Sequence, residues 1–213
     1  MNFLKGLICQ AASHSKGHMF SSIQEFSIIK YFGIDCHPPP PPSIKEVTWL
    51  RPPYNWVKCN TDGASRGSPG ASACGGLFRN HLGEFIGAFS ANIGVATSLH
   101  AEICAAIYAI EFAMTRGWTN LWLECDSLLL IQAFSNIQLV PWKLKTKWTN
   151  CLSYIRQIRF RFSHIYREGN TCADRLANAG FFVDGVVWWD YLPSCSRDSF
   201  SRDRLGLPNY RFR

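Results

Sequence analysis

Four carboxylic acids stand at junctions between predicted strands and helices, and their order constrains the fold more than any other feature of the sequence. They are Asp62, Glu102, Asp126 and Asp174. A strand, a helix, a strand and a helix carry them in turn, so one sheet can bring all four together. Clustered acids repel one another unless hard cations such as Mg²⁺ lie among them. The pattern predicts a site for two Mg²⁺ ions, with Mn²⁺ as a substitute, which is a clamp suited to phosphodiester hydrolysis. Four unrelated surface acids are the alternative.

Composition favours a globular protein with an anionic partner. The 213 residues suffice for one sizeable core with tails, and the hydrophobic content of 47% is typical of a folded chain. The net charge is +7, and the stretch from Ser127 to Arg167 holds seven cations and no acid. This asymmetry predicts contact with nucleic acid, with a merely solvated basic face as the alternative. The candidate phosphate contacts are Lys143, Lys145 and Lys147.

Cysteine usage favours a reduced, intracellular protein of the nucleus or cytoplasm. The nine cysteines include no C-x-x-C pair, which argues against a zinc ribbon or a redox motif. The first residues lack the apolar run of a signal peptide, and no apolar run approaches the length of a membrane span. We expect neither membrane insertion nor an obligate protein partner.

The chain is predicted to divide into four segments. Residues 1–37 are weakly patterned, with one short helix or strand at 23–32, and residues 38–55 form a linker that opens with five prolines. Such a run is a stiff spacer, and a ligand for a proline-recognising domain is the alternative. Residues 56–183 carry the acids in a regular pattern. Residues 184–213 lack a period and are expected to be a poorly ordered tail.

The pattern over 56–183 predicts an α/β fold with a five-stranded mixed sheet. Three antiparallel strands are expected first, at 56–62, 71–79 and 84–92. The order then continues with a helix at 97–116, a strand at 120–125, helices at 127–136 and 141–156, a strand at 158–165 and a helix capped by Asn170. Because a helical crossover makes the first and fourth strands parallel neighbours, Asp62 and Asp126 are expected side by side at strand ends.

Five segments in order resemble one known family. They are 60–64, Gly75-Gly76, 100–102, 124–127 and 164–177. The segments are similar to type 1 ribonuclease H, and in particular to the ribonuclease H-like, reverse transcriptase-like domains of plant retroelements, over residues 56–182. The resemblance implies a ribonuclease H-like fold with helices on both faces of the sheet. It also implies a metal-dependent endonuclease that hydrolyses the RNA strand of RNA–DNA hybrids.

The resemblance assigns roles to single residues. The four acids match the family's metal ligands, and His164 matches a loop histidine that helps product release or proton transfer; a structural histidine is the alternative. The family has asparagine where this chain has Ser68, and paired asparagines where it has Ser98 and Leu99. It also often has glutamine in place of Leu128. These departures weaken the expected reading of the RNA 2′-hydroxyl, which distinguishes RNA from DNA.

Two functions from different classes follow from these observations. The first is the hybrid-specific endonuclease, whose polar contacts with nucleic acid are expected from Ser68, Ser98 and Asn170 together with the three lysines. The alternative is a non-catalytic nucleic-acid-binding module derived from a retroelement. Cleavage of a hybrid in the presence of Mg²⁺ distinguishes the two.

Overall fold

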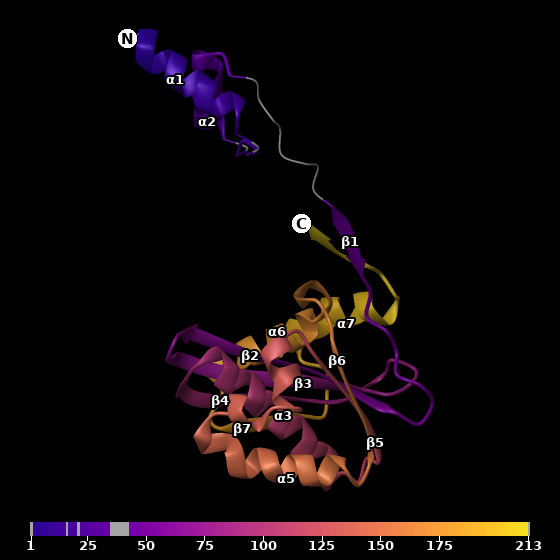
Figure 1. Cartoon of the computed structure of the whole chain (residues 1–213). Helices are drawn as coiled ribbons and strands as arrows, with labels where there is room; N and C mark the ends of the chain where they lie inside the picture. Colours follow the sequence, from indigo (N-terminus) through magenta and orange to yellow (C-terminus); the bar gives the residue numbers. More distant parts are fainter. Residues whose placement is uncertain (1, 16, 21, 35–42, 213) are drawn as a thin grey trace. The chain divides into compact units, whose positions relative to one another are not determined.

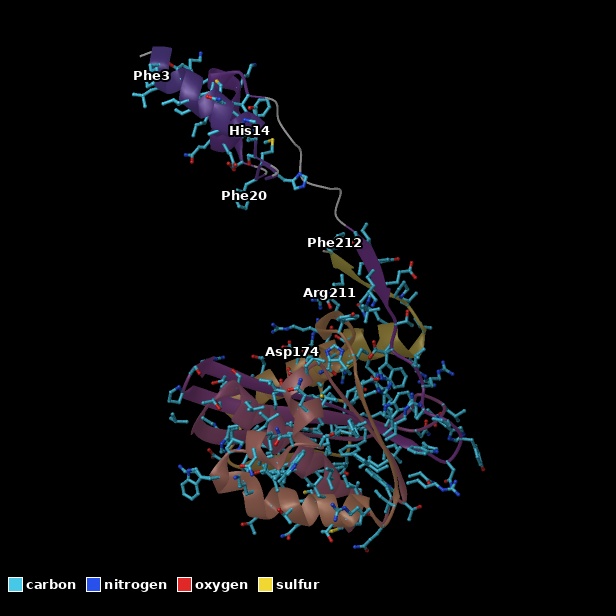
Figure 2. All side chains as sticks on the ribbon, viewed as in Figure 1. Phe3, His14, Phe20, Asp174, Arg211 and Phe212 are labelled. Carbon is cyan, nitrogen blue, oxygen red and sulfur yellow. The ribbon has the colours of Figure 1, made fainter. Side chains whose placement is uncertain are left out.

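The structure, a computed structural model, describes residues 2–15, 17–20, 22–34 and 43–212. The predicted proline run at 38–42 lies outside these ranges. The chain divides into two units, Met1–Ile44 with Phe212–Arg213 and Lys45–Arg211. In the first unit, α1 (Asn2–Ser13) and α2 (Ile23–Phe32) leave Phe3 and Phe20 exposed (Figure 2). The element predicted at 23–32 as a short helix or strand is a helix, α2.

A six-stranded sheet forms the centre of the larger unit, in the order β6–β5–β2–β3–β4–β7 (Figure 1). Its strands are β2 (Val57–Gly67), β3 (Gly70–Arg79), β4 (Phe85–Ala96), β5 (Asn120–Cys125), β6 (Arg159–His164) and β7 (Val186–Trp189). The strands β2, β3 and β4 form an antiparallel meander, and β5 and β6 run parallel to β2. The predicted mixed α/β sheet is confirmed, with β7 as an additional strand at its edge.

Helices cover both faces of this sheet, as the sequence predicts. One face carries α3 (Ser98–Thr115), α4 (Leu128–Ala133) and α5 (Lys145–Ile155); the other carries α6 (Thr171–Ala179) and α7 (Arg197–Arg204). Short 3-10 turns are η1 (Ile137–Leu139), η2 (Trp142–Leu144), η3 (Arg167–Gly169), η4 (Gly180–Phe182) and η5 (Ser194–Ser196). The larger core lies under α3, around Ile103, Ile107 and Phe89. A smaller apolar cluster lies under α6, around Leu77 and Leu176.

The first strand of the sheet is longer than its pattern predicts. The pattern ends the strand at Asp62 and makes 63–70 a loop, whereas β2 continues to Gly67 and the turn is confined to residues 67–70. The parallel pairing with β5 does end early, at Asn60 opposite Glu124. Asp62 therefore lies within β2 but just beyond the end of its neighbour β5, which is the position that leaves its side chain room for a ligand.

The C-terminal segment differs most from its prediction. The sequence predicts a poorly ordered tail at 184–213, but β7 pairs with β4, and α7 buries Phe200 against the α6 side of the sheet. A two-stranded sheet joins β8 (Asn209–Phe212) to β1 (Ile44–Val47). The sequence pattern misses these elements because β7 has only four residues and α7 is mostly polar, so neither shows a clear hydrophobic period.

The segment before β2 also differs from a plain linker. Residues 45–55 belong to the larger unit, and Val47 and Trp49 are buried in a cluster with Ile165. The cysteines in the described part of the chain are free thiols. Among the described residues, no helix combines the length and the apolar character that a membrane span requires.

Candidate metal centre

Two glycines allow helices to approach the sheet closely from its two faces. Gly63 lies against α3, where an added Cβ would overlap the backbone nitrogen of Glu102. Gly75 lies on the opposite face, where an added Cβ would meet the backbone of Leu176 and Ala177 in α6. Because the strands pair Asp62 with Gly75, both helices reach β2 at the same level. This close packing carries the acids of α3 and α6 to the acid of β2.

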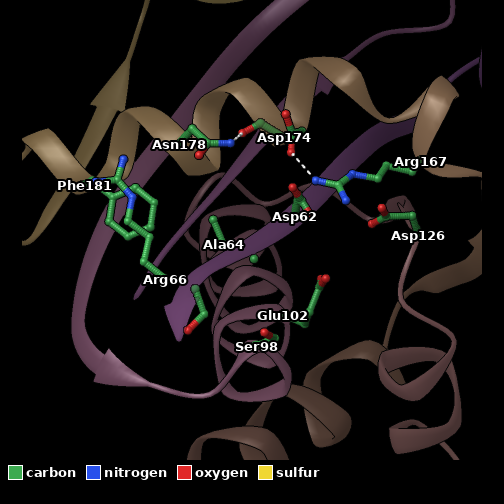
Figure 3. A pocket seen from close by; sticks show the side chains of 12 residues that line it. Asp62, Ala64, Arg66, Ser98, Glu102, Asp126, Arg167, Asp174, Asn178 and Phe181 are labelled. Atoms are coloured by element: carbon green, nitrogen blue, oxygen red, sulfur yellow. Dashed lines mark hydrogen bonds and ion pairs between the residues drawn. The ribbon is translucent and has the colours of Figure 1, made fainter. Parts of the chain in front are cut away.

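Three of the predicted acids form a tight cluster. One carboxylate oxygen from each of Asp62, Glu102 and Asp126 lies within 4.8 Å of the others. Asp62 belongs to β2, Glu102 to the first turns of α3, and Asp126 to the residue that follows β5. All three line one open pocket, which Figure 3 shows from close by. The cluster therefore has the proximity that shared ligation of a cation requires.

The fourth acid lies in the same pocket but has a partner. Asp174, in the first turn of α6, lines the pocket, and its Oδ1 lies 3.4 Å from Nη2 of Arg167 (Figure 3). The side chain of Arg167 is 77% exposed, so this surface ion pair is weak and can open. The sequence brings all four acids to one pocket, with Asp174 at its rim rather than in the tight cluster.

Burial and repulsion from neighbouring acids disfavour the ionised forms of Asp62 and Glu102. Burial, followed by the charges of Asp126 and Asp174, raises the pKa of Asp62 to about 7. Burial, followed by the charges of Asp62 and Asp126, raises the pKa of Glu102 above its ordinary value. In addition, Oε2 of Glu102 is buried and has no hydrogen-bond partner within the described residues. An arrangement of this kind is stable at neutral pH only when protons or cations are bound.

The donor set fits hard divalent cations. All the clustered groups are carboxylates, which are the ligands that Mg²⁺ and Mn²⁺ prefer, and no thiol or imidazole belongs to the cluster. The unpartnered oxygen of Glu102 supplies a ready ligand. Asp62, Glu102 and Asp126 are thus the residues that would hold a cation, with Asp174 available from the rim.

His164 contacts the cluster through the backbone. It is the last residue of β6, and its Nε2 lies 3.1 Å from the carbonyl oxygen of Asp126, an atom that can only accept. Its ring also makes an edge contact with Tyr166. The structure therefore places His164 where it supports the Asp126 backbone, and a role in proton transfer remains a prediction.

The polar residues predicted to contact nucleic acid have different positions. Ser98 is exposed and lines the pocket, whereas Ser68 is exposed on the β2–β3 turn and is not among the residues that line it. Asn170 is only 1% exposed, and its side chain bonds to Thr61, Asp126 and Asn60 instead of capping α6. In this conformation Asn170 therefore cannot contact a bound ligand directly, because its side-chain amide is already hydrogen-bonded within the protein.

The elements that carry the predicted lysines, η2 and α5, pack against α3. Lys143 and Lys147 are exposed and Lys145 is half-buried. Burial, and then the charge of Lys143, lower the pKa of His100, which places Lys143 near the start of α3 and hence near the pocket. Of the two tryptophans among the lysines, predicted to be core residues at helical spacing, Trp148 is buried but Trp142 is 77% exposed.

Three further residues of the pocket are absent from the sequence-based site. Arg167 pairs with Asp174, and Arg66 lies over the ring of Phe181 with 4.2 Å from its guanidinium carbon to the ring centre (Figure 3). The only signal for Arg167 in the sequence is its place as the last cation of the acid-free stretch. Arg66 and Phe181 have no signal, because they are far apart in the chain and meet only in the fold.

Comparison with known protein families gives one match. Residues 60–180 match the family described as reverse transcriptase-like. Among curated proteins, the chain is 33% identical over 162 residues to the Arabidopsis thaliana "Putative ribonuclease H protein", covering 75% of this chain and 26% of that protein. It is also 33% identical over 129 residues to ribonuclease HI of Halobacterium salinarum, covering 55% of this chain and 60% of that one. The chain thus spans 26% of the length of the Arabidopsis thaliana protein and 60% of the length of the Halobacterium salinarum enzyme.

Solved structures of ribonuclease H1 share the fold. That of the halophilic archaeon Halobacterium salinarum matches with a TM-score of 0.53 and 28% identity, over 60% of this chain and 98% of that one. The ribonuclease H1 named LC11, solved in complex with an RNA/DNA hybrid, matches with a TM-score of 0.53 and 27% identity, over 59% of this chain and 96% of that one. Both structures cover little more than half of this chain, so segments of the larger unit lie outside the shared fold.

Proposed function

The chain belongs to the reverse transcriptase-like family of ribonuclease H-like domains, and on that premise we propose that it is a metal-dependent endoribonuclease acting on the RNA strand of RNA–DNA hybrids. One observation carries the proposal. Asp62, Glu102 and Asp126 form a tight cluster of carboxylates, of which Asp62 is buried and the other two are half-buried, and Oε2 of Glu102 has no hydrogen-bond partner among the described residues. A folded protein retains such a cluster at a cost in stability, which a role in binding cations explains.

The residues at the site would have different roles in the proposed reaction. Asp62, Glu102 and Asp126 would hold two Mg²⁺ ions, or Mn²⁺ in their place, with Asp174 joining from the rim. Cations bound there would supply an activated water and charge stabilisation for the leaving oxygen of a phosphodiester. Arg167 balances Asp174 and supplies positive charge at the mouth of the pocket. His164 holds the Asp126 backbone through its Nε2 contact.

Recognition of the hybrid would use the surface around the pocket. The LC11 ribonuclease H1 was solved with an RNA/DNA hybrid, and this chain shares its fold. Lys143, Lys145 and Lys147 would contact phosphates beside α3, and Ser98 would donate a hydrogen bond at the pocket edge. We also propose that the chain derives from a retroelement, which the match to the reverse transcriptase-like family and the similarity to an Arabidopsis thaliana protein support.

A cleavage assay tests the proposal. Purified full-length protein is incubated with an RNA–DNA hybrid labelled on the RNA strand, and in parallel with duplex RNA, duplex DNA and single-stranded RNA. We expect cleavage of the hybrid with Mg²⁺, none with a chelator, and none by Asp126→Asn. Cleavage that persists with the chelator or in the mutant would contradict the assigned site.

The alternative function gives a different result in the same assay. A non-catalytic binding module would retain the hybrid in a gel-shift experiment without cutting it at any Mg²⁺ or Mn²⁺ concentration. The matched control is an established ribonuclease H on the same substrate, which shows that the hybrid is cleavable. Tight binding without cleavage would replace the enzyme proposal with the binding module.

A further inference from the structure

A second cluster of polar residues is buried directly behind the acids, and its partners come from outside the family's core. It consists of Trp49, Lys58, Asn60, Arg79, Glu124, Asn170 and Asp203, each 6% exposed or less. Trp49 precedes and Asp203 follows the matched residues 60–180. Asp203 lies on α7, in the segment that the sequence pattern leaves without structure. The cluster is therefore the place where the flanking segments meet the domain.

Arg79 links α7 to the strand that carries Asp62. Its Nη1 donates to Oδ2 of Asp203 at 2.7 Å, and its Nη2 donates to Oδ1 of Asn60, also at 2.7 Å. The guanidinium lies over the ring of Trp49, with 3.6 Å to the ring centre, and the Trp49 indole nitrogen donates to the same Asn60 oxygen at 2.8 Å. A planar guanidinium makes these two bonds from two separate nitrogens in a fixed fork, whereas a lysine has a single donor nitrogen.

These donors fix which way the Asn60 amide points. Guanidinium and indole nitrogens only donate, so the Asn60 oxygen must face them and its nitrogen must face the other way. That nitrogen donates to Glu124 Oε2 at 3.0 Å and to Asn170 Oδ1 at 3.2 Å. Glu124 is a pure acceptor when ionised, which is consistent with the same orientation.

The orientation of Asn60 sets that of Asn170 in turn. Because the Asn170 oxygen accepts from Asn60, its nitrogen faces Thr61 and Asp126, and it donates to the Thr61 carbonyl at 2.9 Å. The same nitrogen lies 3.3 Å from Oδ1 of Asp126. Asp126 follows the end of β5, so the regular strand pairing does not hold its side chain. The last donor of the chain of amides therefore reaches Asp126, one of the three clustered acids.

We propose that Asp203, Arg79, Trp49, Asn60 and Asn170 form a hydrogen-bond relay of fixed polarity that positions Asp126 for cation binding. These are positioning residues, because none of them except Asn170 touches an acid of the site. The nuclease unit then extends beyond the family domain, from Trp49 to α7. The inference rests on the proposed metal centre.

Two variants interrupt the relay while keeping its shape. Arg79→Lys retains the positive charge but replaces the two-nitrogen fork that bonds Asp203 and Asn60 with a single donor nitrogen, and Trp49→Phe removes only the indole donor and keeps a ring over Arg79. Loss of a partner that orients a metal ligand lowers metal affinity by about 10- to 100-fold. We expect about tenfold weaker Mn²⁺ binding for Arg79→Lys and a loss of a few fold for Trp49→Phe.

The matched control is Phe200→Leu. Phe200 lies on α7 three residues before Asp203, is 7% exposed and packs in the apolar cluster under α6, so Phe200→Leu removes packing from the same helix but no hydrogen-bond donor or acceptor of the relay. We expect Phe200→Leu to lower the melting temperature while leaving Mn²⁺ affinity unchanged.

Mn²⁺ binding to the full chain is measured by electron paramagnetic resonance at a temperature well below every melting transition, and hybrid cleavage by kcat and KM. The expected result is weaker Mn²⁺ binding and lower kcat at unchanged KM in the relay variants alone. Unchanged Mn²⁺ affinity in both relay variants, or an equal loss in Phe200→Leu, would overturn the relay. If Arg79→Lys does not fold, Trp49→Phe decides. Failure of the wild type to bind Mn²⁺ would instead refute the metal centre itself.

Discussion

Two clusters of charged residues meet at β2 and the end of β5, a buried one behind the site and a partly buried one in the pocket, and they differ in charge balance. Behind the site, Lys58 pairs with Glu124 at 2.8 Å and Arg79 pairs with Asp203 at 2.7 Å, so positive and negative charges are equal in number. At the site, Asp62, Glu102 and Asp126 are all acids. Residues 124 and 126 stand two positions apart at the end of β5 and belong to different clusters.

The charge balance of each cluster indicates whether its charges are compensated within the protein. In the balanced cluster, burial lowers the pKa of Lys58 to about 8 while Glu124 opposes the shift, so the lysine keeps its charge at neutral pH. In the acid cluster, burial and neighbouring acids act in the same direction and raise the pKa of Asp62 to about 7. A balanced cluster is complete within the protein, whereas an unbalanced one requires a bound cation to be stable when ionised.

The largest expected effect is on activity. Asp126→Asn removes a proposed cation ligand and should reduce hybrid cleavage to the level seen with a chelator. The same change removes a repulsive charge, so the metal-free mutant should melt at or above the wild-type temperature. The measurement is a cleavage time course together with a thermal melt in EDTA. A mutant that cleaves normally would show that the acid cluster is not the site.

The next largest expected effect is on the stability of the fold, and it results from substituting Glu124. Glu124→Gln leaves Lys58 buried without its counter-charge, which should destabilise the fold by about 3 kcal/mol. Urea denaturation of wild type and mutant in EDTA measures the free energy of unfolding. If Glu124→Gln and Asp126→Asn change stability equally, the distinction between the two clusters fails.

The acid cluster should make the stability of the metal-free protein depend on pH in a predictable direction. The folded-state pKa of Asp62, about 7, lies above the ordinary value near 3.8, so its contribution to stability is complete below pH 4 and is lost as the pH rises to 7. Metal-free wild type should therefore lose stability between pH 5 and pH 8. Asp126→Asn should lose less, because one repulsive charge is gone. An equal loss in both proteins, measured by urea denaturation at the two pH values, would contradict this expectation.

A smaller effect concerns the exposed lysines beside α3. Reversing the charges of Lys143, Lys145 and Lys147 should weaken hybrid binding and reduce the slope of log K against log salt by roughly 0.7 to 0.9 per lost phosphate contact. The control reverses three exposed arginines of α7 (Arg197, Arg202 and Arg204) on the other face of the sheet. An unchanged slope for the lysine variant would make the basic stretch a solvated surface.

The smallest expected effect is on substrate preference. Ser98 lines the pocket and can be changed to asparagine to add one hydrogen bond, which is worth about 1 kcal/mol or roughly fivefold in hybrid over duplex RNA. Leu99 is a poorer target than its sequence position indicates, because it is half-buried against the core under α3. The measurement compares kcat/KM of wild type and Ser98→Asn on both substrates. A strong hybrid preference in the wild type would show that other groups read the 2′-hydroxyl.

The sequence predicts the centre of the fold well because its local signals agree. Turn residues at 80–83, a capping residue at Thr97 or Ser98 and the glycine that follows the helix predict boundaries that the structure reproduces, with Thr97 as the cap. The extent of β2 is missed because glycines at 63 and 67 resemble a loop. Gly63 is required instead by the close approach of α3.

The acids were predictable from the sequence and the cluster behind them was not. Each acid of the pocket has a local setting at an element boundary, which the sequence displays directly. Arg79 and Asp203 pair across 124 positions, and α7 contains one large apolar residue, Phe200, so neither the pairing nor the helix has a periodic signal. Trp49 is hidden in a proline-rich stretch that resembles a linker.

Stabilisation by Mg²⁺ tests the unbalanced cluster most directly. The thermal melt of chelator-treated wild type at pH 7.5 is followed as Mg²⁺ is raised to millimolar concentrations, with Asp126→Asn and Glu124→Gln measured in parallel. We expect the melting temperature of the wild type to rise, that of Glu124→Gln to rise from a lower starting value, and that of Asp126→Asn to remain unchanged. A wild type that does not respond, or an Asp126→Asn variant that responds as strongly as the wild type, would contradict a cation site at these acids.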